Sequence, residues 1–154
     1  MHQAYIDPFM QAGRDVLAMV TGAPVSCGTV APAGRPLTPE RVSIVVGVNG
    51  ALQGQVILSM TDATATGIAG LMLGMDAPEF DEMAASAVSE LGNMISGNAA
   101  ILLGEAQLHC DLTPPTIIYG NDIHIAVRAP ALMVPLILPL GVVEICVSLT
   151  EAAA

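Results

Sequence analysis

A run of β-branched residues interrupted by an Asn-Gly pair constrains the fold of this chain most strongly. Residues 42–48 are rich in Val and Ile, and a second apolar run covers residues 52–60, beyond Asn49-Gly50. β-branched side chains favour strands, and Asn-Gly between two such runs favours a type I′ turn. The sequence therefore predicts an antiparallel hairpin over residues 42–60.

Helical periodicity is clearest near the start of the chain and in its middle. Residues 5–20 repeat apolar side chains at three- and four-residue steps, with Asp7-Pro8 as the expected start and Gly22 as the expected end. A second helix is expected from a Thr61-Asp62 cap to about residue 73. A third is expected to begin in the acidic run at 79–82 and to continue to about residue 106.

The remaining segments favour strands and loops. A Pro- and Gly-rich loop is expected at residues 31–40, and two strand pairs are expected to turn at Gly120-Asn121 and around Leu140-Gly141. Strands are expected within residues 24–30, 116–119, 123–128, 132–138 and 142–149. This order of elements predicts one α+β domain over residues 1–154, with helices packed on a mostly antiparallel sheet that contains two β-hairpins.

Charge and hydropathy exclude several classes of function. The net charge is −10, with four arginines and no lysine, so the chain lacks the clustered cations that a nucleic-acid binder needs. The longest uncharged apolar run covers residues 129–143, which is shorter than the roughly 18–20 residues of a membrane span. The sequence therefore predicts a cytoplasmic protein with neither a nucleic-acid nor a membrane partner.

The cysteines and histidines predict no disulfide and no metal site. Cys27, Cys110 and Cys146 are odd in number and contain no CxxC pair, so buried thiols in a reducing compartment are expected. His109 stands beside Cys110, but adjacent residues of a strand point to opposite faces. We therefore expect no metal ion or cofactor bound by this chain.

The third expected helix separates into two faces on a helical wheel. The apolar stripe contains Ala84, Val88, Leu91, Ile95 and Leu102. The face nearly opposite contains Ser86, Glu90, Asn93 and Gly97. The helix is therefore expected to bury one face and to present a hydroxyl, a carboxylate and an amide on the other.

Spacing alone leaves two explanations for this polar face. Glu and Asn three residues apart are common on solvated helices. Gly92 and Gly97 each cost roughly 1 kcal/mol relative to Ala inside a helix. Room for an approaching partner would explain them, and so would close packing within the domain.

The motif resembles the signature of the CheC/CheX/FliY family of chemotaxis phosphatases. Ser86, Glu90, Asn93 and Pro115 match the Asp or Ser, the Glu, the Asn and the Pro of that signature, and Gly97 matches a glycine often found after the Asn. The opening residues 5–9, the hairpin at 42–60 and the Met72-Leu73-Gly74 ending are also similar to CheX. Only one Glu-x-x-Asn occurs in this sequence, as in the single-motif CheX type.

The resemblance implies an activity and a partner. It implies a CheC-like fold and a phosphatase acting on the phospho-aspartate of a CheY-type response regulator. Asn93 would position the attacking water and Glu90 would dock on a lysine of the regulator. Ser86 would assist, and Pro115 would shape the neighbouring loop. The resemblance further implies a homodimer, and a Mg²⁺ ion that belongs to the regulator.

Two other functions are compatible with the sequence. One is a module that binds a response regulator, or a flagellar-switch component, without catalysis. The intact Glu90 and Asn93 argue against it. The other is a structural dimer that exposes an apolar sheet, given the hydrophobic residue content of 53%. Phosphoryl-dependent binding to a regulator is not expected from such a dimer.

Overall fold

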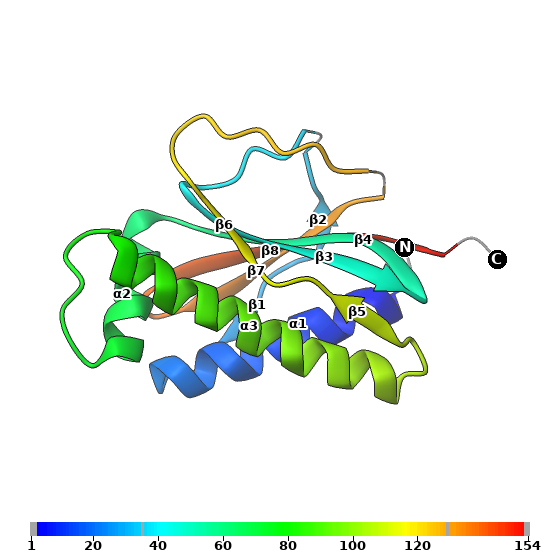
Figure 1. The fold of residues 1–154 in the computed structure, drawn as a ribbon, viewed down its shortest axis with the longest axis horizontal. Coiled ribbons are helices and arrows are strands. Elements are labelled where there is room, and N and C mark those ends of the chain that lie inside the picture. Colours follow the sequence, from blue (N-terminus) through cyan, green and yellow to red (C-terminus); the bar gives the residue numbers. More distant parts are fainter. Residues whose placement is uncertain (1–2, 35, 129, 153–154) are drawn as a thin grey trace.

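The computed structural model describes residues 3–34, 36–128 and 130–152. These residues form three helices and eight strands. Figure 1 shows two main layers, with the helices on one side of a single sheet and irregular segments above its other side. This arrangement confirms the α+β fold and the helices packed on an antiparallel sheet.

The sheet is antiparallel at every pairing of its strands. Its main path runs β1-β7-β8-β4-β3-β5, with β2 also beside β7 and β6 also beside β3. The strands are β1 Ser26–Cys27, β2 Ala31–Pro32, β3 Val42–Gly50, β4 Leu52–Met60, β5 Cys110–Leu112, β6 Thr116–Tyr119, β7 Leu132–Leu138 and β8 Gly141–Glu151. The hairpins β3–β4 and β7–β8 build the centre, and short strands cover each edge.

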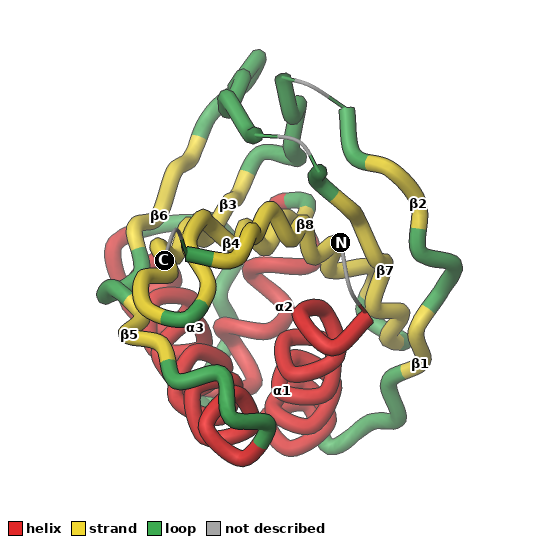
Figure 2. Tube along the Cα trace, turned by 90° about the vertical axis from the view of Figure 1, so that its right-hand side faces the viewer, coloured by secondary structure: helices red, strands yellow, loops and turns green. Residues whose placement is uncertain are grey.

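The helices are α1 Gln3–Thr21, α2 Asp62–Leu73 and α3 Glu82–Glu105, and they lie together on one face of the sheet (Figure 2). Thr61 caps α2 by accepting a hydrogen bond from the Thr64 backbone N–H, and Gly74 ends it with a left-handed φ of 67°. Asp81 caps α3 by accepting from the Ala84 N–H. The expected second and third helices are therefore confirmed to within a few residues.

The main core lies between the helices and the inner face of the sheet. Inward-pointing residues of β3, β4 and β8 alternate with outward-pointing ones, as the period of two requires. The largest fully buried side chains include Ile6, Leu17, Ile44, Leu58, Met60, Ile68, Leu91, Leu103 and Ile145. This aliphatic layer holds α3 firmly, so the exposed face of that helix has a fixed position.

The predicted strand at residues 123–128 is wrong. Leu37 and Ile125 form an isolated bridge, and no strand lies at 123–128. The side chains still alternate, because Ile125 and Val127 pack against a small outer cluster with Ile57 and Cys146. An extended segment lying across a sheet face shows the same alternation as a strand, but it lacks the ladder of hydrogen bonds.

The predicted type I′ turn at Asn49-Gly50 is also wrong, although the hairpin itself is confirmed. Val48 pairs with Gly54, while Asn49 and Gly50 pair with β5. Gly50 has a φ of 139°, and a Cβ there would lie 2.6 Å from the His109 carbonyl oxygen. The end of β3 therefore pairs with β5 rather than closing a two-residue turn.

Helix α1 begins earlier than Asp7-Pro8, which lies inside it. Tyr5 and Ile6 are buried, and the Tyr5 hydroxyl donates to the Glu151 carboxylate. This packing stabilises the turn before the proline. The predicted end is confirmed, since the Gly22 N–H donates to the Ala18 carbonyl at 2.9 Å. Within the described ranges, no helix has the length and apolar character needed to cross a membrane.

Candidate functional site

The predicted polar face of α3 is exposed in the structure. Ser86, Glu90, Asn93 and Gly97 are all exposed. The opposite face buries Ala84, Ala87, Val88, Leu91, Gly92, Ile95, Ala99 and Leu103. Residues three or four apart on a helix are neighbours, so the Glu90 carboxylate and the Asn93 amide lie side by side. The structure therefore brings the three polar residues of the motif onto one accessible surface.

The two glycines of α3 have different surroundings. Gly92 is buried, and a Cβ there would lie 2.8 Å from the Ile44 Cγ2 and 3.1 Å from the Pro115 Cβ. A Cβ at Gly97 would meet no neighbouring atom within 4 Å. Gly92 therefore serves packing inside the domain, whereas Gly97 leaves open space beside Asn93.

Pro115 lies next to the motif because it packs on Gly92. The segment before it is fixed to β3, since the Gly47 N–H donates to the Thr113 Oγ1 at 2.8 Å and the Thr113 N–H donates to the Gly47 carbonyl at 2.9 Å. One contact on the helix and two hydrogen bonds on the sheet thus hold residues 113–115 beside α3. Pro115 therefore lies against α3 at Gly92, directly after the groove residue Pro114.

A shallow groove separates α3 from this segment. Its volume is about 350 Å³, and Asn93 and Gly97 line one side of it. The other side is formed by Cys110, Asp111, Leu112, Thr113 and Pro114. Asn93 therefore faces an open depression rather than flat solvent.

Sequence reasoning missed the far wall of this groove. Asp111 is exposed on β5 and contributes a second carboxylate near Asn93. The Pro114-Pro115 pair, which precedes the β-branched run at residues 116–118, was the available signal for a rigid wall. The pairing of β5 with the end of β3 brings the wall here, and that long-range pairing cannot be read from local sequence.

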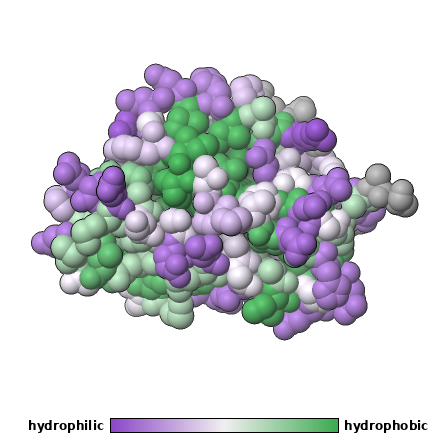
Figure 3. Space-filling model, viewed as in Figure 1, coloured by the Kyte–Doolittle hydropathy of each residue, from purple (hydrophilic) through white to green (hydrophobic). Residues whose placement is uncertain are grey.

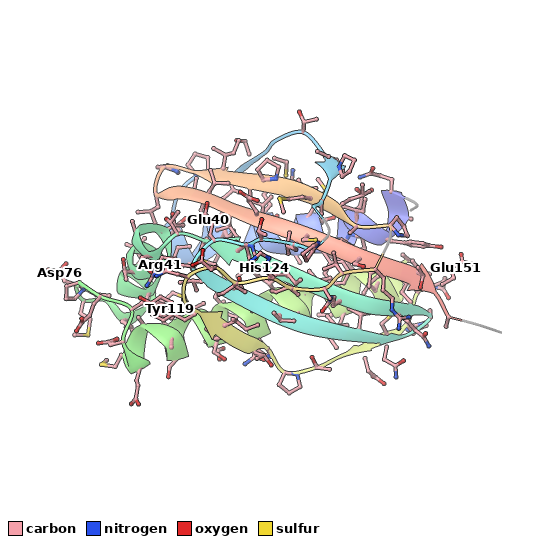
Figure 4. The ribbon with its side chains drawn as sticks, turned by 90° about the horizontal axis from the view of Figure 1, so that it is seen from above. Glu40, Arg41, Asp76, Tyr119, His124 and Glu151 are labelled. Carbon is pink, nitrogen blue, oxygen red and sulfur yellow. The ribbon has the colours of Figure 1, made fainter. Side chains whose placement is uncertain are left out.

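An arginine-centred cluster lies near the start of α3. The Arg41 Nε donates to the Asp62 Oδ2 at 2.8 Å, and an Arg41 terminal nitrogen donates to the Tyr119 hydroxyl at 3.0 Å. The Tyr119 ring packs on Phe80, just before α3, with 4.8 Å between centroids. The hydrogen bonds to Tyr119 and then Asp62 raise the pKa of Arg41. Figure 4 shows Arg41 and Tyr119 together at one end of the sheet.

The surface around α3 is mixed in polarity. Figure 3 shows hydrophilic and pale surface along the helix and an apolar patch above it, in the region of β6. Ile117 and Ile118 of that strand are half-buried. Apolar surface therefore lies on the side of α3 that contacts β6.

Cys110 lines the groove beside Asn93, whereas Cys27 and Cys146 are not part of its lining. All three cysteines are free, but only Cys146 is buried as expected, while Cys27 and Cys110 are half-buried. Burial raises the pKa of Cys146 to about 11. A thiol with that pKa stays protonated and packs as a small apolar group. In the described part of the chain, no group of three or more His, Cys, Asp or Glu residues could hold a metal ion.

Known proteins resemble this chain in sequence and in fold. Residues 42–136 match the family described as chemotaxis phosphatase CheX. The chain is 34% identical over 136 residues to the CheY-P phosphatase CheX of Thermotoga maritima. This alignment covers 86% of this chain and 84% of that protein.

Solved structures show the same fold over almost the entire chain. A CheC-like superfamily protein from Shewanella sp. PV-4 has a TM-score of 0.88 at 23% identity, covering 98% of this chain and 100% of that one. CheX in the CheX–CheY–BeF3–Mg²⁺ complex from Borrelia burgdorferi has a TM-score of 0.81 at 29% identity, covering 96% of this chain and 98% of the matched chain.

Proposed function

The chain belongs to the CheX family of chemotaxis phosphatases, and from that membership we propose that it hydrolyses the phospho-aspartate of a CheY-type response regulator with Glu90 and Asn93. The observation that carries the proposal is the exposed carboxylate and amide of α3, beside an open groove. The relative from Thermotoga maritima is a CheY-P phosphatase, and the Borrelia relative forms a complex with CheY.

Asn93 has the chemistry to position a water molecule. Its amide can accept one hydrogen bond from water and donate another, but it cannot act as a base. The water oxygen forms a bond to phosphorus, the bond between phosphorus and the aspartyl oxygen breaks, and the water proton leaves with the phosphate or to solvent. An acyl phosphate has a good leaving group, so orientation of the water supplies most of what is needed.

Glu90 is suited to docking rather than to proton transfer. It is exposed, and within the described residues it makes no ion pair, so its carboxylate is available to a cation of the partner. A lysine of the regulator fits this role, as the family resemblance implies. A pair that becomes shielded in the complex adds orientation as well as affinity.

The other motif residues support these two. Ser86 lies one turn before Glu90 and offers a hydroxyl to the partner. Gly97 keeps the surface low beside Asn93, so that a regulator can approach closely. Pro115 acts as a positioning residue, because it packs on the backbone of α3 at Gly92 and fixes the groove wall.

The magnesium ion in this proposal belongs to the regulator. The Borrelia complex contains CheY, BeF3 and Mg²⁺ together with CheX. When bound, the ion offsets negative charge on the phosphoryl oxygens. We propose that this chain contributes no cofactor of its own.

Three further predictions accompany this function. We expect the chain to act as a single domain, to form a homodimer and to work in the cytoplasm, where a response regulator would meet it. Apolar side chains at the β7–β8 hairpin offer surface for a second subunit, since Ile137, Leu140 and Val142 are 40–44% exposed.

The test is the decay of a phosphorylated CheY-type regulator from the same organism. Wild type in catalytic amounts should accelerate the decay, and Asn93→Ala should slow the accelerated rate about a hundredfold while still binding the regulator. Glu90→Ala should raise KM about tenfold with a smaller effect on kcat. Asn98→Ala and Glu105→Ala are matched controls, because both residues are exposed on α3 outside the motif.

Each alternative function predicts a different result. A non-catalytic binding module would bind the phosphorylated regulator without accelerating its decay, even in excess. A purely structural dimer would show no preference for the phosphorylated form. Full activity in both Asn93→Ala and Glu90→Ala would remove the proposed roles while leaving the family assignment intact.

A further inference from the structure

The outer face of the sheet contains a second cavity, on the side opposite the helices. Its volume is about 410 Å³, which lies within the range of small-molecule sites. Its lining includes Val45, Gly47, Gln53, Gln55, Arg128 and Thr150. The α3 groove shares none of these residues, although its Thr113 is hydrogen-bonded to Gly47 of this cavity.

The roof of this cavity is held in place by two side chains of the sheet. The Gln55 Nε2 donates to the Ala126 carbonyl at 2.9 Å, and the Ser148 Oγ donates to the Arg128 carbonyl at 2.7 Å. Gln55 and Ser148 are paired across β4 and β8, so the two hydrogen bonds start from neighbouring side chains on the outer face of the sheet. The backbone at 126–128 is thus fixed above the sheet, with open space left beneath it.

The floor and walls leave room and offer polar groups. Gly47 contributes only backbone to the lining, and the Thr113 side chain would lie 3.0 Å from a Cβ at that position. Gln53 and Thr150 are paired across β4 and β8, so their side chains lie next to each other on the outer face. Both are exposed, and the structure gives neither side chain a partner among the described residues. Val45 adds an apolar surface.

Charge distinguishes this cavity from the rest of the molecule. The chain has 14 acidic residues and four basic ones, yet among the described residues Arg128 is the only charged one in the lining. Arg41, by contrast, is paired with Asp62. Within the described ranges Arg128 has no carboxylate partner. An arginine without a carboxylate partner, in the lining of a cavity free of carboxylates, is suited to an anion.

We propose that this cavity binds a small organic anion through its carboxylate or phosphate group. The guanidinium presents paired N–H donors that match two oxygens of either group. Gln53 and Thr150 supply further donors, and the apolar part of the ligand lies against Val45. Figure 4 views the molecule from this side, with the overlying segment crossing the strands.

The test uses the arginine signals of the protein. With four arginines in the chain, the Nε–H signals are few enough to assign in a ¹⁵N-labelled sample. Sodium phosphate and sodium benzoate are titrated separately, at constant ionic strength with chloride. At least one of them should shift the Arg128 signal saturably with a Kd below about 10 mM. Phosphate or benzoate saturation identifies which of the two groups is recognised.

Two arginine variants distinguish anion binding at this cavity from a general effect of the net charge. Binding to the variants is read from the backbone amide signals of Gln53 and Thr150, which line the cavity. Arg128→Gln should weaken binding at least about tenfold, whereas Arg14→Gln, which changes an exposed arginine of α1, should leave it unchanged. The backbone carbonyl that accepts from Ser148 remains in Arg128→Gln, so the roof and the unfolding temperature should be retained. Linear shifts with both probes, or equal affinity in Arg128→Gln, would overturn the proposal.

Discussion

Helix α3 offers a direct comparison, because its two faces meet different surroundings. Gly92 and Gly97 are five positions apart, yet one is enclosed by Ile44 and Pro115 and the other has no neighbour within 4 Å. The buried face fixes where the helix lies, and the exposed face determines what it can bind. The same residue type is therefore required by packing in one place and by access in the other.

The two faces of the sheet repeat this contrast. The inner face is aliphatic and closed by helices, whereas the outer face carries Ser43, Ser59, Ser148 and the half-buried Glu144 beneath irregular segments. Changes on the inner surfaces should alter stability, and changes on the outer surfaces should alter binding or pH dependence. Four predictions test this division.

Leu91→Ala should give the largest effect on stability. Leu91 is fully buried on the inner face of α3, and removal of its side chain leaves a cavity. We expect a loss of about 3 kcal/mol in the free energy of unfolding, measured by urea denaturation. The residual folded protein should keep kcat within about twofold. A stable but inactive variant would show that the two faces are coupled.

Gly92→Ala and Gly97→Ala form a matched pair. Alanine favours the helix by about 1 kcal/mol at either position. At Gly92 the new Cβ would also displace Ile44 or Pro115, at a cost of about 1–3 kcal/mol. Gly97→Ala should therefore be the more stable variant by about 2 kcal/mol in urea denaturation. Equal stabilities would mean that the packing around Gly92 relaxes freely.

Gly97→Leu tests the exposed face. The side chain has room in the free protein, so the unfolding temperature should not fall. It would, however, protrude beside Asn93 where the regulator is proposed to approach. We expect kcat/KM to fall about tenfold, while Gly97→Ala should retain most activity. Activity at the wild-type level in Gly97→Leu would place the partner elsewhere.

Glu144→Gln tests the outer face of the sheet and should have the smallest effect. Burial, and then the charge of Glu40, raises the pKa of Glu144 above its usual 4.5. The folded state therefore holds this proton more tightly, and stability is lost as pH rises through the raised pKa. Glu144→Gln should raise the unfolding temperature by a few degrees at pH 7 and by less at pH 4. An equal shift at both pH values would contradict this explanation.

The local sequence pattern was enough to predict most helices and strands and the polar motif of α3. The Thr61 cap of α2, the two central hairpins and the exposed placement of Glu90 and Asn93 were predicted, because each depends on residues close in sequence. The predicted Asp7-Pro8 start of α1 was wrong, because packing of Tyr5 and Ile6 extends the helix. The segment 123–128 was assigned wrongly, because its alternation arises from packing on the sheet face. The Asn49-Gly50 turn failed for a similar reason, since β5 pairs with the end of β3.

The sequence by itself determined the family motif, the amphipathic character of α3 and the order of the helices and the central strands, since these follow from the chemistry of neighbouring residues. It did not predict β5, nor β2 within the expected loop at 31–40. The tertiary structure decided which glycine is enclosed, where Asp111 and Pro115 lie relative to Asn93, and that Arg128 stands over a cavity on the far face. Each of these depends on contacts between residues distant in the chain. Their free energy is gained only when the sheet and helices assemble, so no local pattern encodes them.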